Sequence, residues 1–282
     1  MDLPLLKKSV AIGLVCDKGG VSKTTTALHL ASWLAKISHR HEYGWRVLLV
    51  DMDPQATAAS TLSCQPEPPA LEQSLGRLLV DTKADPLSFP RSSPWRPETL
   101  FYIPSSPETM ETAIPALLRM PNADLRLRAL AAKLSAAYQV IVFDSGGRVS
   151  DLLVRNVGFA STHLIIPANA DWFGYEGLSR TVRWQADIGD SLAGLGLTPP
   201  QLLGVLLSHV RTNVGNSEET VSRTRALLGD AVFETMIPFT IMFADAISRG
   251  QDVFSFGVSS PAAKAVNQLG LEVLQRVVQS QA

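Results

Sequence analysis

The sequence predicts an α/β fold: a doubly wound, mostly parallel sheet flanked by helices on both faces. Short apolar runs alternate with helix-like patterns along the chain, which is typical of parallel strands joined by crossover helices. A glycine-rich turn follows the first apolar run and opens a helix, as in phosphate-binding α/β folds. Hydrophobic residues make up 46% of the chain, ample for a buried core. We expect residues 1–282 to form a single domain.

The strands are expected at short apolar runs, and the helices where apolar residues recur at helical spacing. The predicted strands cover residues 10–16, 46–51, 100–104, 139–144, 163–167 and 202–208, with a shorter candidate at 232–237. The clearest predicted helices cover residues 23–37, 124–138, 176–192 and 262–278.

A proline-rich stretch, residues 64–97, interrupts this alternation. It offers one plausible short helix, over residues 71–80. Strand–helix alternation resumes beyond it, so we interpret the stretch as a surface excursion and not as a domain boundary.

Net charge, cysteine spacing and hydropathy argue against a generally basic nucleic-acid-binding protein, a cysteine metal site and a membrane protein. The formal net charge of −1 gives no general attraction to nucleic acid, so DNA binding would require a local basic patch. Cys16 and Cys64 lack the spacing of a metal site and fit a thiol-reducing compartment. No run reaches the roughly 18 apolar residues of a membrane span, and the N-terminus does not resemble a signal peptide. We expect a cytoplasmic protein with no membrane partner.

Residues 17–25 have the properties of a phosphate-binding loop. Gly19 and Gly20 allow a tight turn that brings backbone N–H groups against phosphate oxygens, and the following helix points its positive end at the same anion. Lys23 can reach the β- and γ-phosphates, and the Thr24 hydroxyl is placed to bind Mg²⁺. The alternative is a chance Gly-Gly turn followed by a lysine.

The general pattern has glycine at the positions of Asp17 and Ser22, so the match is incomplete. With Lys18, however, the loop resembles the deviant Walker A motif of the ParA/MinD family of P-loop ATPases, which tolerates substitution at the position of Ser22. The resemblance implies that ATP is bound through the whole loop, Val21 and Thr25 included. It also implies that Lys18 crosses an ATP-dependent homodimer to the partner's phosphates.

Carboxylates end the second predicted strand, where ligands bind in open α/β sheets. The run from Asp51 to Gln55 resembles the family's Asp-x-Asp-Pro-Gln motif, with Ala56 where relatives usually have glycine. The resemblance implies that Asp53 positions the attacking water and leaves Asp51 as a possible further metal ligand. The alternative for Asp53 is a helix N-cap followed by Pro54, and both roles are compatible.

Asp144 ends the fourth predicted strand after four apolar residues, the usual arrangement of a Walker B aspartate that holds Mg²⁺. The alternative is a solvated carboxylate at a strand end. The family normally has two prolines after this aspartate, whereas this chain has Gly146 and Gly147. We expect metal binding to survive and the loop to be more mobile.

The resemblance extends over nearly the whole chain, and it implies that Ile237 and Pro238 line the adenine pocket. It is stronger to the ParA/Soj partition branch than to MinD, because the tail 268–282 lacks the basic residues of a membrane-binding helix. The first strand starts by about residue 9, so we expect a short form without a separate N-terminal DNA-binding domain.

A ParA/Soj-type protein would bind DNA non-specifically as an ATP dimer and associate with the nucleoid. A ParB-like partner would stimulate its slow ATP hydrolysis. Relatives often carry arginines at the positions of Phe239 and Met242. The candidate substitutes, each of which can instead be an ordinary solvated charge, are Arg211, Arg223, Arg225 and Arg249.

Two alternatives remain open. The protein can instead be a ParA-like ATPase that positions a protein cargo through an adaptor. It can also be a nucleotide-gated regulatory switch with little hydrolysis, because Asp17, Ser22, Gly146 and Gly147 depart from the usual motifs.

Overall fold

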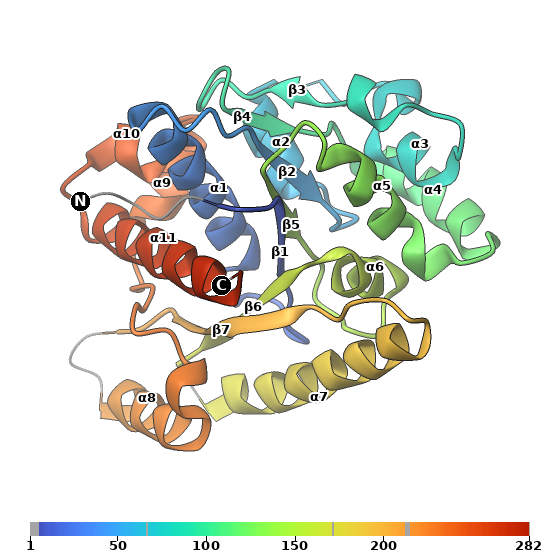
Figure 1. Cartoon of the computed structure of the whole chain (residues 1–282). Coiled ribbons are helices and arrows are strands. Elements are labelled where there is room, and N and C mark those ends of the chain that lie inside the picture. The colour runs from blue at the N-terminus through green and yellow to red at the C-terminus, as the bar shows by residue number, and fades with distance from the viewer. Residues whose placement is uncertain (1–5, 66, 171, 212–214, 282) are drawn as a thin grey trace.

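The computed structural model describes residues 6–65, 67–170, 172–211 and 215–281. Within this part of the chain, seven strands form one sheet in the order β3-β4-β2-β5-β1-β6-β7 (Figure 1). Neighbouring strands are parallel except for the antiparallel pair β3–β4. The strands are β1 Val10–Leu14, β2 Val47–Asp51, β3 Arg91–Ser92, β4 Leu100–Tyr102, β5 Val140–Asp144, β6 His163–Asn169 and β7 Gln201–Ser208. The predicted doubly wound α/β fold is confirmed.

Helices cover both faces of the sheet, so the central strands are buried on both sides (Figure 1). This explains why they read as continuous apolar runs instead of alternating ones. The helices are α1 Lys23–Arg40, α2 Thr57–Ser63, α3 Leu75–Val80, α4 Pro107–Leu118, α5 Arg126–Leu134, α6 Leu152–Ala160, α7 Trp172–Gly194, α8 Gly215–Leu228, α9 Met242–Ser248, α10 Val253–Gly257 and α11 Pro261–Ser280.

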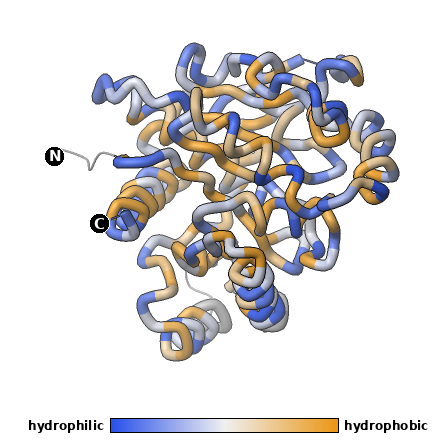
Figure 2. The backbone as a smooth tube through the Cα atoms, turned by 45° about the vertical axis from the view of Figure 1, so that its right-hand side comes forward, coloured by the Kyte–Doolittle hydropathy of each residue, from blue (hydrophilic) through white to orange (hydrophobic). Residues whose placement is uncertain are grey.

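The two largest groups of buried hydrophobic residues lie on opposite faces of the sheet. Ile12 and Val142 pack with α1 and α11 on one face, whereas Ile141 and Phe143 pack with α3 to α6 on the other. Adjacent residues of one strand point to opposite faces, as the pleat requires. In Figure 2 the hydrophobic stretches concentrate in the interior, and hydrophilic stretches lie mainly on surface helices and loops.

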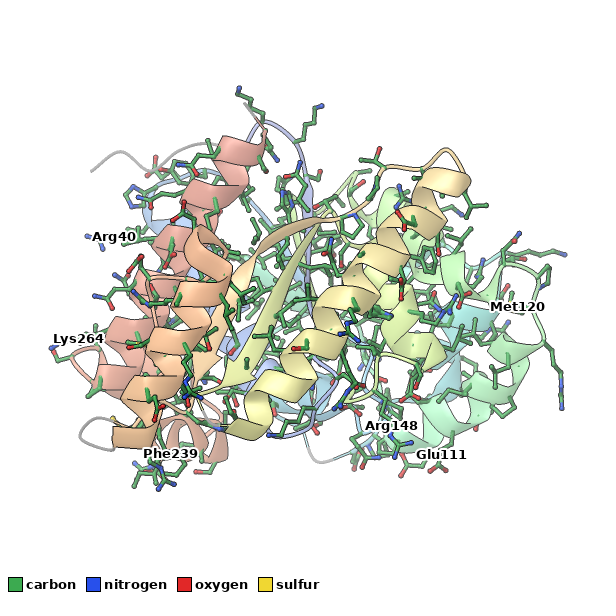
Figure 3. The ribbon with its side chains drawn as sticks, turned by 90° about the horizontal axis from the view of Figure 1, so that it is seen from below. Arg40, Glu111, Met120, Arg148, Phe239 and Lys264 are labelled. Carbon is green, nitrogen blue, oxygen red and sulfur yellow. The ribbon has the colours of Figure 1, made fainter. Side chains whose placement is uncertain are left out.

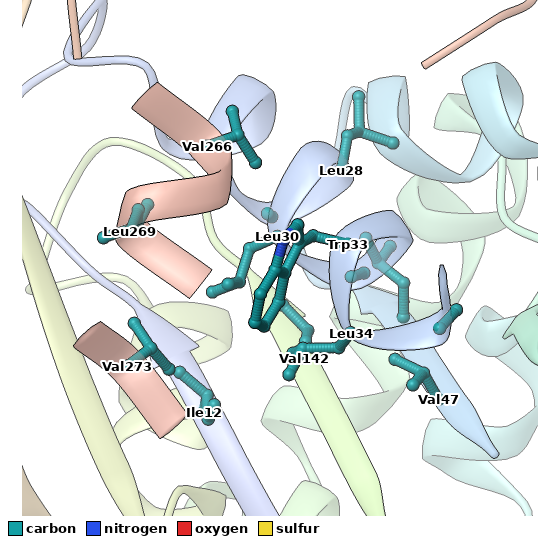
Figure 4. Close-up of a cluster of buried hydrophobic side chains, with 14 of the residues drawn as sticks. Ile12, Leu28, Leu30, Trp33, Leu34, Val47, Val142, Val266, Leu269 and Val273 are labelled. Carbon is teal, nitrogen blue, oxygen red and sulfur yellow. The ribbon is translucent and has the colours of Figure 1, made fainter. Parts of the chain in front are cut away.

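The C-terminal helix α11 packs into the core, as its sequence predicts. Figure 4 shows Trp33 of α1 among Val266, Leu269 and Val273 of α11. The two helices approach closely because Gly270 has no side chain, and a methyl group there would lie under 3.0 Å from the Trp33 ring. In the described part of the chain, no helix combines the length and apolar character needed to cross a membrane.

Two local predictions are wrong. Residues 232–237 form no strand: an isolated bridge joins Val232 to Val205, and the backbone N–H groups of Phe233 and Ile237 donate to Val205 and Leu207 of β7. These separate bonds do not make a continuous ladder, because apolar spacing reports burial and does not require one. The stretch 64–97 is only partly a surface excursion. Its predicted helix splits into a 3₁₀ turn, Leu71–Gln73, and α3, which is capped by Ser74 and carries fully buried leucines packed in the core.

Candidate nucleotide-binding site

The candidate site lies at the carboxyl edge of the sheet, where open α/β folds bind ligands. The loop 17–22 follows β1 and leads into α1, while β2 and β5 end beside it in Asp51 and Asp144, which are register partners. Figure 3 shows Arg148, from the segment after β5, and Phe239 along the same edge of the molecule. The sheet order therefore brings together the three motifs that the sequence predicts.

The loop wraps around the Lys23 ammonium group. Lys23 is 6% exposed, and its Nζ donates to the carbonyl oxygens of Lys18 (2.7 Å) and Cys16 (3.4 Å). Burial lowers the pKa of Lys23, and the thiol of Cys16 and nearby carboxylates oppose this shift. A methyl group on Gly19 or Gly20 would meet no atom within 4 Å, so this part of the loop faces open space.

Ser22 is held by the end of β7. Its φ of 64° is a left-handed conformation that costs a non-glycine residue about 1–2 kcal/mol. The Ser22 hydroxyl forms a 2.8 Å hydrogen bond with Nε2 of His209, which offsets part of this cost. The Ser208 hydroxyl also donates to the carbonyl oxygen of Val21 (3.1 Å). His209 could not be predicted from the sequence, because no local signal connects it to the loop.

Asp17 connects the loop to two other elements. Its backbone N–H donates to the Thr181 hydroxyl (2.9 Å) of α7. Its carboxylate accepts from Arg180 Nε (2.6 Å) and from the backbone N–H of Val149 (3.2 Å). Asp17 is therefore a structural tie between the loop, α7 and the segment after β5. The Gly146–Gly147 segment, which we expected to be mobile, is followed by Val149, whose backbone N–H is anchored on Asp17.

Asp51 and Asp144 are both fully buried but differ in their hydrogen bonds. The two Asp51 oxygens accept from the backbone N–H groups of Asp53 and Ala59, both at 3.0 Å, and burial raises the pKa of Asp51 to about 6. Asp144 Oδ1 accepts from its neighbouring backbone N–H, whereas Oδ2 is buried with no hydrogen-bond partner among the described residues.

A divalent cation fits this orphaned oxygen. Burial raises the pKa of Asp144 well above its usual value, and the Asp51 charge adds to the rise, while the Thr24 hydroxyl and the Lys23 ammonium lower it. A carboxylate and a hydroxyl oxygen are the hard ligands that Mg²⁺ takes in proteins. Asp144 and Thr24 thus fit the metal better than Asp51, whose oxygens backbone amides already occupy.

The alternative role proposed for Asp53, a helix N-cap followed by Pro54, is wrong. Helix α2 begins only at Thr57, and its N-cap position is Ala56, with a left-handed φ of 51°. Asp53 instead closes a turn: its Oδ1 accepts from Gln55 N and its carbonyl oxygen from Ala56 N, both at 2.9 Å. The Asp53 carboxylate faces Gly146, where an added methyl group would lie 3.9 Å from it.

Ile237 and Pro238 lie at the corner of the site where β7 ends. The backbone N–H of Ile237 donates to Leu207 (2.9 Å), and that of Phe239 to Val210 (2.9 Å). The Phe239 ring lies edge-on to His209, with centroids 5.8 Å apart. Through His209, this segment is joined to Ser22 of the loop.

The four candidate DNA-binding arginines all have intramolecular contacts. Two carry ion pairs: Arg223 with Glu219 (2.8 Å) and Arg225 with Glu234 (3.0 Å). The other two, Arg211 and Arg249, stack over the rings of Phe239 and Phe256, with centroid distances of 4.4 and 5.1 Å. Glu219 and Glu234 neutralise part of the positive charge that Arg223 and Arg225 would offer to DNA phosphates.

Comparison with known proteins identifies the family. Residues 9–192 match a family model described as an AAA domain, AAA_31. The chain is 29% identical over 267 residues to the chromosome-partitioning ATPase Soj of Thermus thermophilus, covering 94% of this chain and 96% of the relative. It is 30% identical over 264 residues to the sporulation initiation inhibitor protein Soj of Bacillus subtilis, covering 93% and 97%.

A solved structure shares the fold. Cobyrinic acid a,c-diamide synthase from Mycobacterium smegmatis, with bound ADP and magnesium, superposes with a TM-score of 0.76 at 22% identity. The alignment covers 97% of both chains. The sequence matches and the shared fold agree with the motifs at the carboxyl edge, and the chain therefore belongs to the ParA/Soj family of P-loop proteins.

Proposed function

We propose that this protein is a ParA-like ATPase that binds ATP with Mg²⁺ through residues 17–25. One observation carries the proposal: the Lys23 ammonium is held on loop carbonyls beneath an open backbone face. The β- and γ-phosphate oxygens would replace those carbonyls as its partners. Val21 and Thr25 complete the loop, and Ile237 and Pro238 line the adenine pocket. The ADP and magnesium in the Mycobacterium smegmatis structure support this nucleotide and metal.

Thr24 and Asp144 would hold the metal. Bound Mg²⁺ would neutralise charge on the β- and γ-phosphate oxygens. Asp144 suits this role because its Oδ2 is buried without a hydrogen-bond partner in the described part of the chain.

Hydrolysis would proceed by in-line attack of water on the γ-phosphate. Asp53, in the turn after β2, would orient the water, and Lys23 with the loop N–H groups would stabilise the charge that develops. Lys18 would reach the partner's phosphates in an ATP-dependent homodimer. Replacing Lys18 with Ala should abolish ATP-dependent dimerisation measured by light scattering, and intact dimerisation would contradict the role.

The biological task we infer is partition of a plasmid or chromosome, with non-specific DNA binding in the ATP state. The chromosome-partitioning relative supports this inference. DNA retardation with ATP, with ADP and without nucleotide, repeated across salt, tests it. An ATP-specific shift that weakens steeply with salt supports partition. Added ParB-like partner should then raise phosphate release.

A second candidate is the positioning of a protein cargo through an adaptor. It is favoured by the exposed Phe239 and Ile241 at a segment where relatives often have arginines, and by the glutamates that pair Arg223 and Arg225. Absence of DNA retardation in every nucleotide state would favour it. If ATP binds but phosphate is not released under any condition, the protein is a nucleotide-gated switch.

A further inference from the structure

A cavity of about 420 Å³ lies beside the candidate nucleotide site, at the carboxyl ends of β2 and β4. Helix α2, residues 65 and 67–70, and the first turn of α4 line it. Its lining residues in the described part of the chain include none of the loop 17–25. The volume falls within the range of small-molecule sites, roughly 300–1,000 Å³.

Ser105 lines this cavity and is 4% exposed. Its hydroxyl is buried and has no hydrogen-bond partner among the residues that the structure describes. Leaving a buried hydroxyl unpaired is unfavourable. A ligand that bonds to Ser105 would recover this cost.

Arg91 and Tyr102 supply further hydrogen-bond donors. They are opposite each other in the antiparallel pair β3–β4, so their side chains lie on one face of the sheet, and both line the cavity. Burial raises the pKa of Tyr102, and the Arg91 guanidinium opposes this rise. Arg91 also donates to the side-chain oxygen of Gln73. Together with Ser105, these groups form a donor set suited to a carboxylate.

Two carboxylates, Glu67 and Glu108, also line the cavity, and both are exposed. The backbone N–H of Glu108 itself and the side chain of Ser106 lower the pKa of the Glu108 carboxylate, so it stays charged at neutral pH. The cavity thus presents one guanidinium and two carboxylates. This combination favours a ligand that carries both a negative and a positive group.

We propose that this cavity binds a free amino acid or a similar small zwitterion. The ligand's carboxylate lies on Arg91, Tyr102 and Ser105, and its ammonium group faces Glu67 and Glu108. Ala59, Pro68 and Pro69 contribute apolar wall for a side chain.

Ligand binding in this cavity also acts on the nucleotide site, and this part rests on the proposed function. Gln55 and Ala56 line the cavity and are the residues whose N–H groups close the Asp53 turn. A ligand packed against them fixes the orientation of the Asp53 carboxylate. Turnover therefore responds to the ligand even though the two sites are separate.

The first test is direct binding, measured calorimetrically on the full chain without nucleotide. L-serine, L-glutamate and L-arginine are each compared with the N-acetylated form, which lacks the ammonium group. We expect saturable binding of at least one free amino acid, weaker for its N-acetylated form. Arg91→Gln should weaken it about tenfold or more, as loss of a charge-assisted hydrogen bond does. Ser105→Ala should weaken it about threefold to tenfold.

The matched control is Arg77→Gln, which removes an arginine that is also exposed and that pairs with Asp81 outside the cavity. This variant should bind as the unchanged protein does. No saturable heat with any amino acid at millimolar concentration would overturn the proposal. The proposal would also be overturned if Arg91→Gln and Ser105→Ala both bound the amino acid as tightly as the unchanged protein, because the ligand would then bind elsewhere.

The second test is ATP turnover with and without the bound amino acid. We expect the amino acid to change phosphate release from the unchanged protein, and the same change in Ser105→Ala to require about threefold to tenfold more amino acid. Binding without any effect on measurable turnover would refute the coupling to Asp53 and leave the binding site intact. Binding by a protein that hydrolyses no ATP would refute the proposed function alone.

Discussion

Replacing His29 with Leu should remove a specific part of the protein's sensitivity to acid. His29 is fully buried in α1, and its ring lies against Trp95 and Phe243 with centroids 5.6 and 5.2 Å apart. Neither ring nitrogen has a hydrogen-bond partner among the described residues. Burial lowers the pKa of His29 from 6.5 to about 4, and the nearby Asp252 charge opposes this shift only in part.

The sign and size of the effect of His29 on stability follow from proton linkage. The unfolded chain protonates His29 near pH 6.5, whereas the folded protein resists until about pH 4, so stability is lost as the pH falls between these values. Between pH 7.5 and pH 5.0 the loss attributable to His29 is about 2 kcal/mol. Asp51, whose pKa is raised to about 6, acts in the opposite direction. The acid sensitivity of the unchanged protein alone therefore does not reveal the contribution of His29.

The measurement is urea unfolding of both proteins at pH 7.5 and pH 5.0, followed by tryptophan fluorescence. All other titrating groups cancel in the comparison, so the free energy of unfolding of the variant relative to the unchanged protein should rise by about 2 kcal/mol at pH 5.0. His39→Leu, an exposed position of the same helix, is the matched control and should show no such rise. If the difference in free energy of unfolding between the His29 variant and the unchanged protein were the same at pH 7.5 and pH 5.0, the reasoning would be refuted.

Three further predictions concern the site and the core. Asp144→Asn should abolish the response of thermal unfolding with ATP to Mg²⁺, because the amide removes the anionic oxygen that would hold the metal. Asp17→Ala should increase hydrogen exchange at the Val149 amide and cost about 1–3 kcal/mol in urea unfolding, because the part-buried Val149 N–H loses its charged acceptor. Gly270→Ala should cost about 1–3 kcal/mol or more in the same assay through overpacking against Trp33.

Each has an internal comparison. Arg180→Ala breaks the ion pair with Asp17 but keeps the Val149 hydrogen bond, so exchange at Val149 should change little; an equal increase would contradict the assignment. Gly194→Ala has open space for the added methyl group and should not destabilise the protein. If both variants lost equal free energy of unfolding, overpacking against Trp33 could not explain the loss in Gly270→Ala. A Mg²⁺ response that persists in Asp144→Asn would remove Asp144 as the metal ligand.

Local patterns predicted the parts of the site that depend on neighbouring residues. The glycine turn, Lys23 and the aspartates at the strand ends could be read from a few consecutive residues, and their strands then lie together because the sheet is parallel. The start of α2 was misplaced by the same local logic. Asp53 and Pro54 satisfy the rules for a helix N-terminus, but the carboxylate closes a turn and the helix begins three residues after Pro54, at Thr57.

Long-range contacts explain what the sequence did not predict. Ser22 and His209 are separated by 187 positions, and Asp17 and Arg180 by 163. A serine at a usual glycine position looked like a defect of the motif, although β7 supplies its partner. Similarly, the sequence predicted a helix over residues 71–80, which contains α3, but not that the leucines of this helix are buried in the core.

The contacts of Asp17 and Ser22 limit how this chain can have evolved. Each residue bonds to a distant partner, Arg180 or His209, so replacing either with glycine removes that bond. Positions 17 and 180, and positions 22 and 209, are therefore expected to vary in pairs among descendants of this sequence. A grafted loop with glycine at both positions should therefore lose these ties to α7 and to the end of β7.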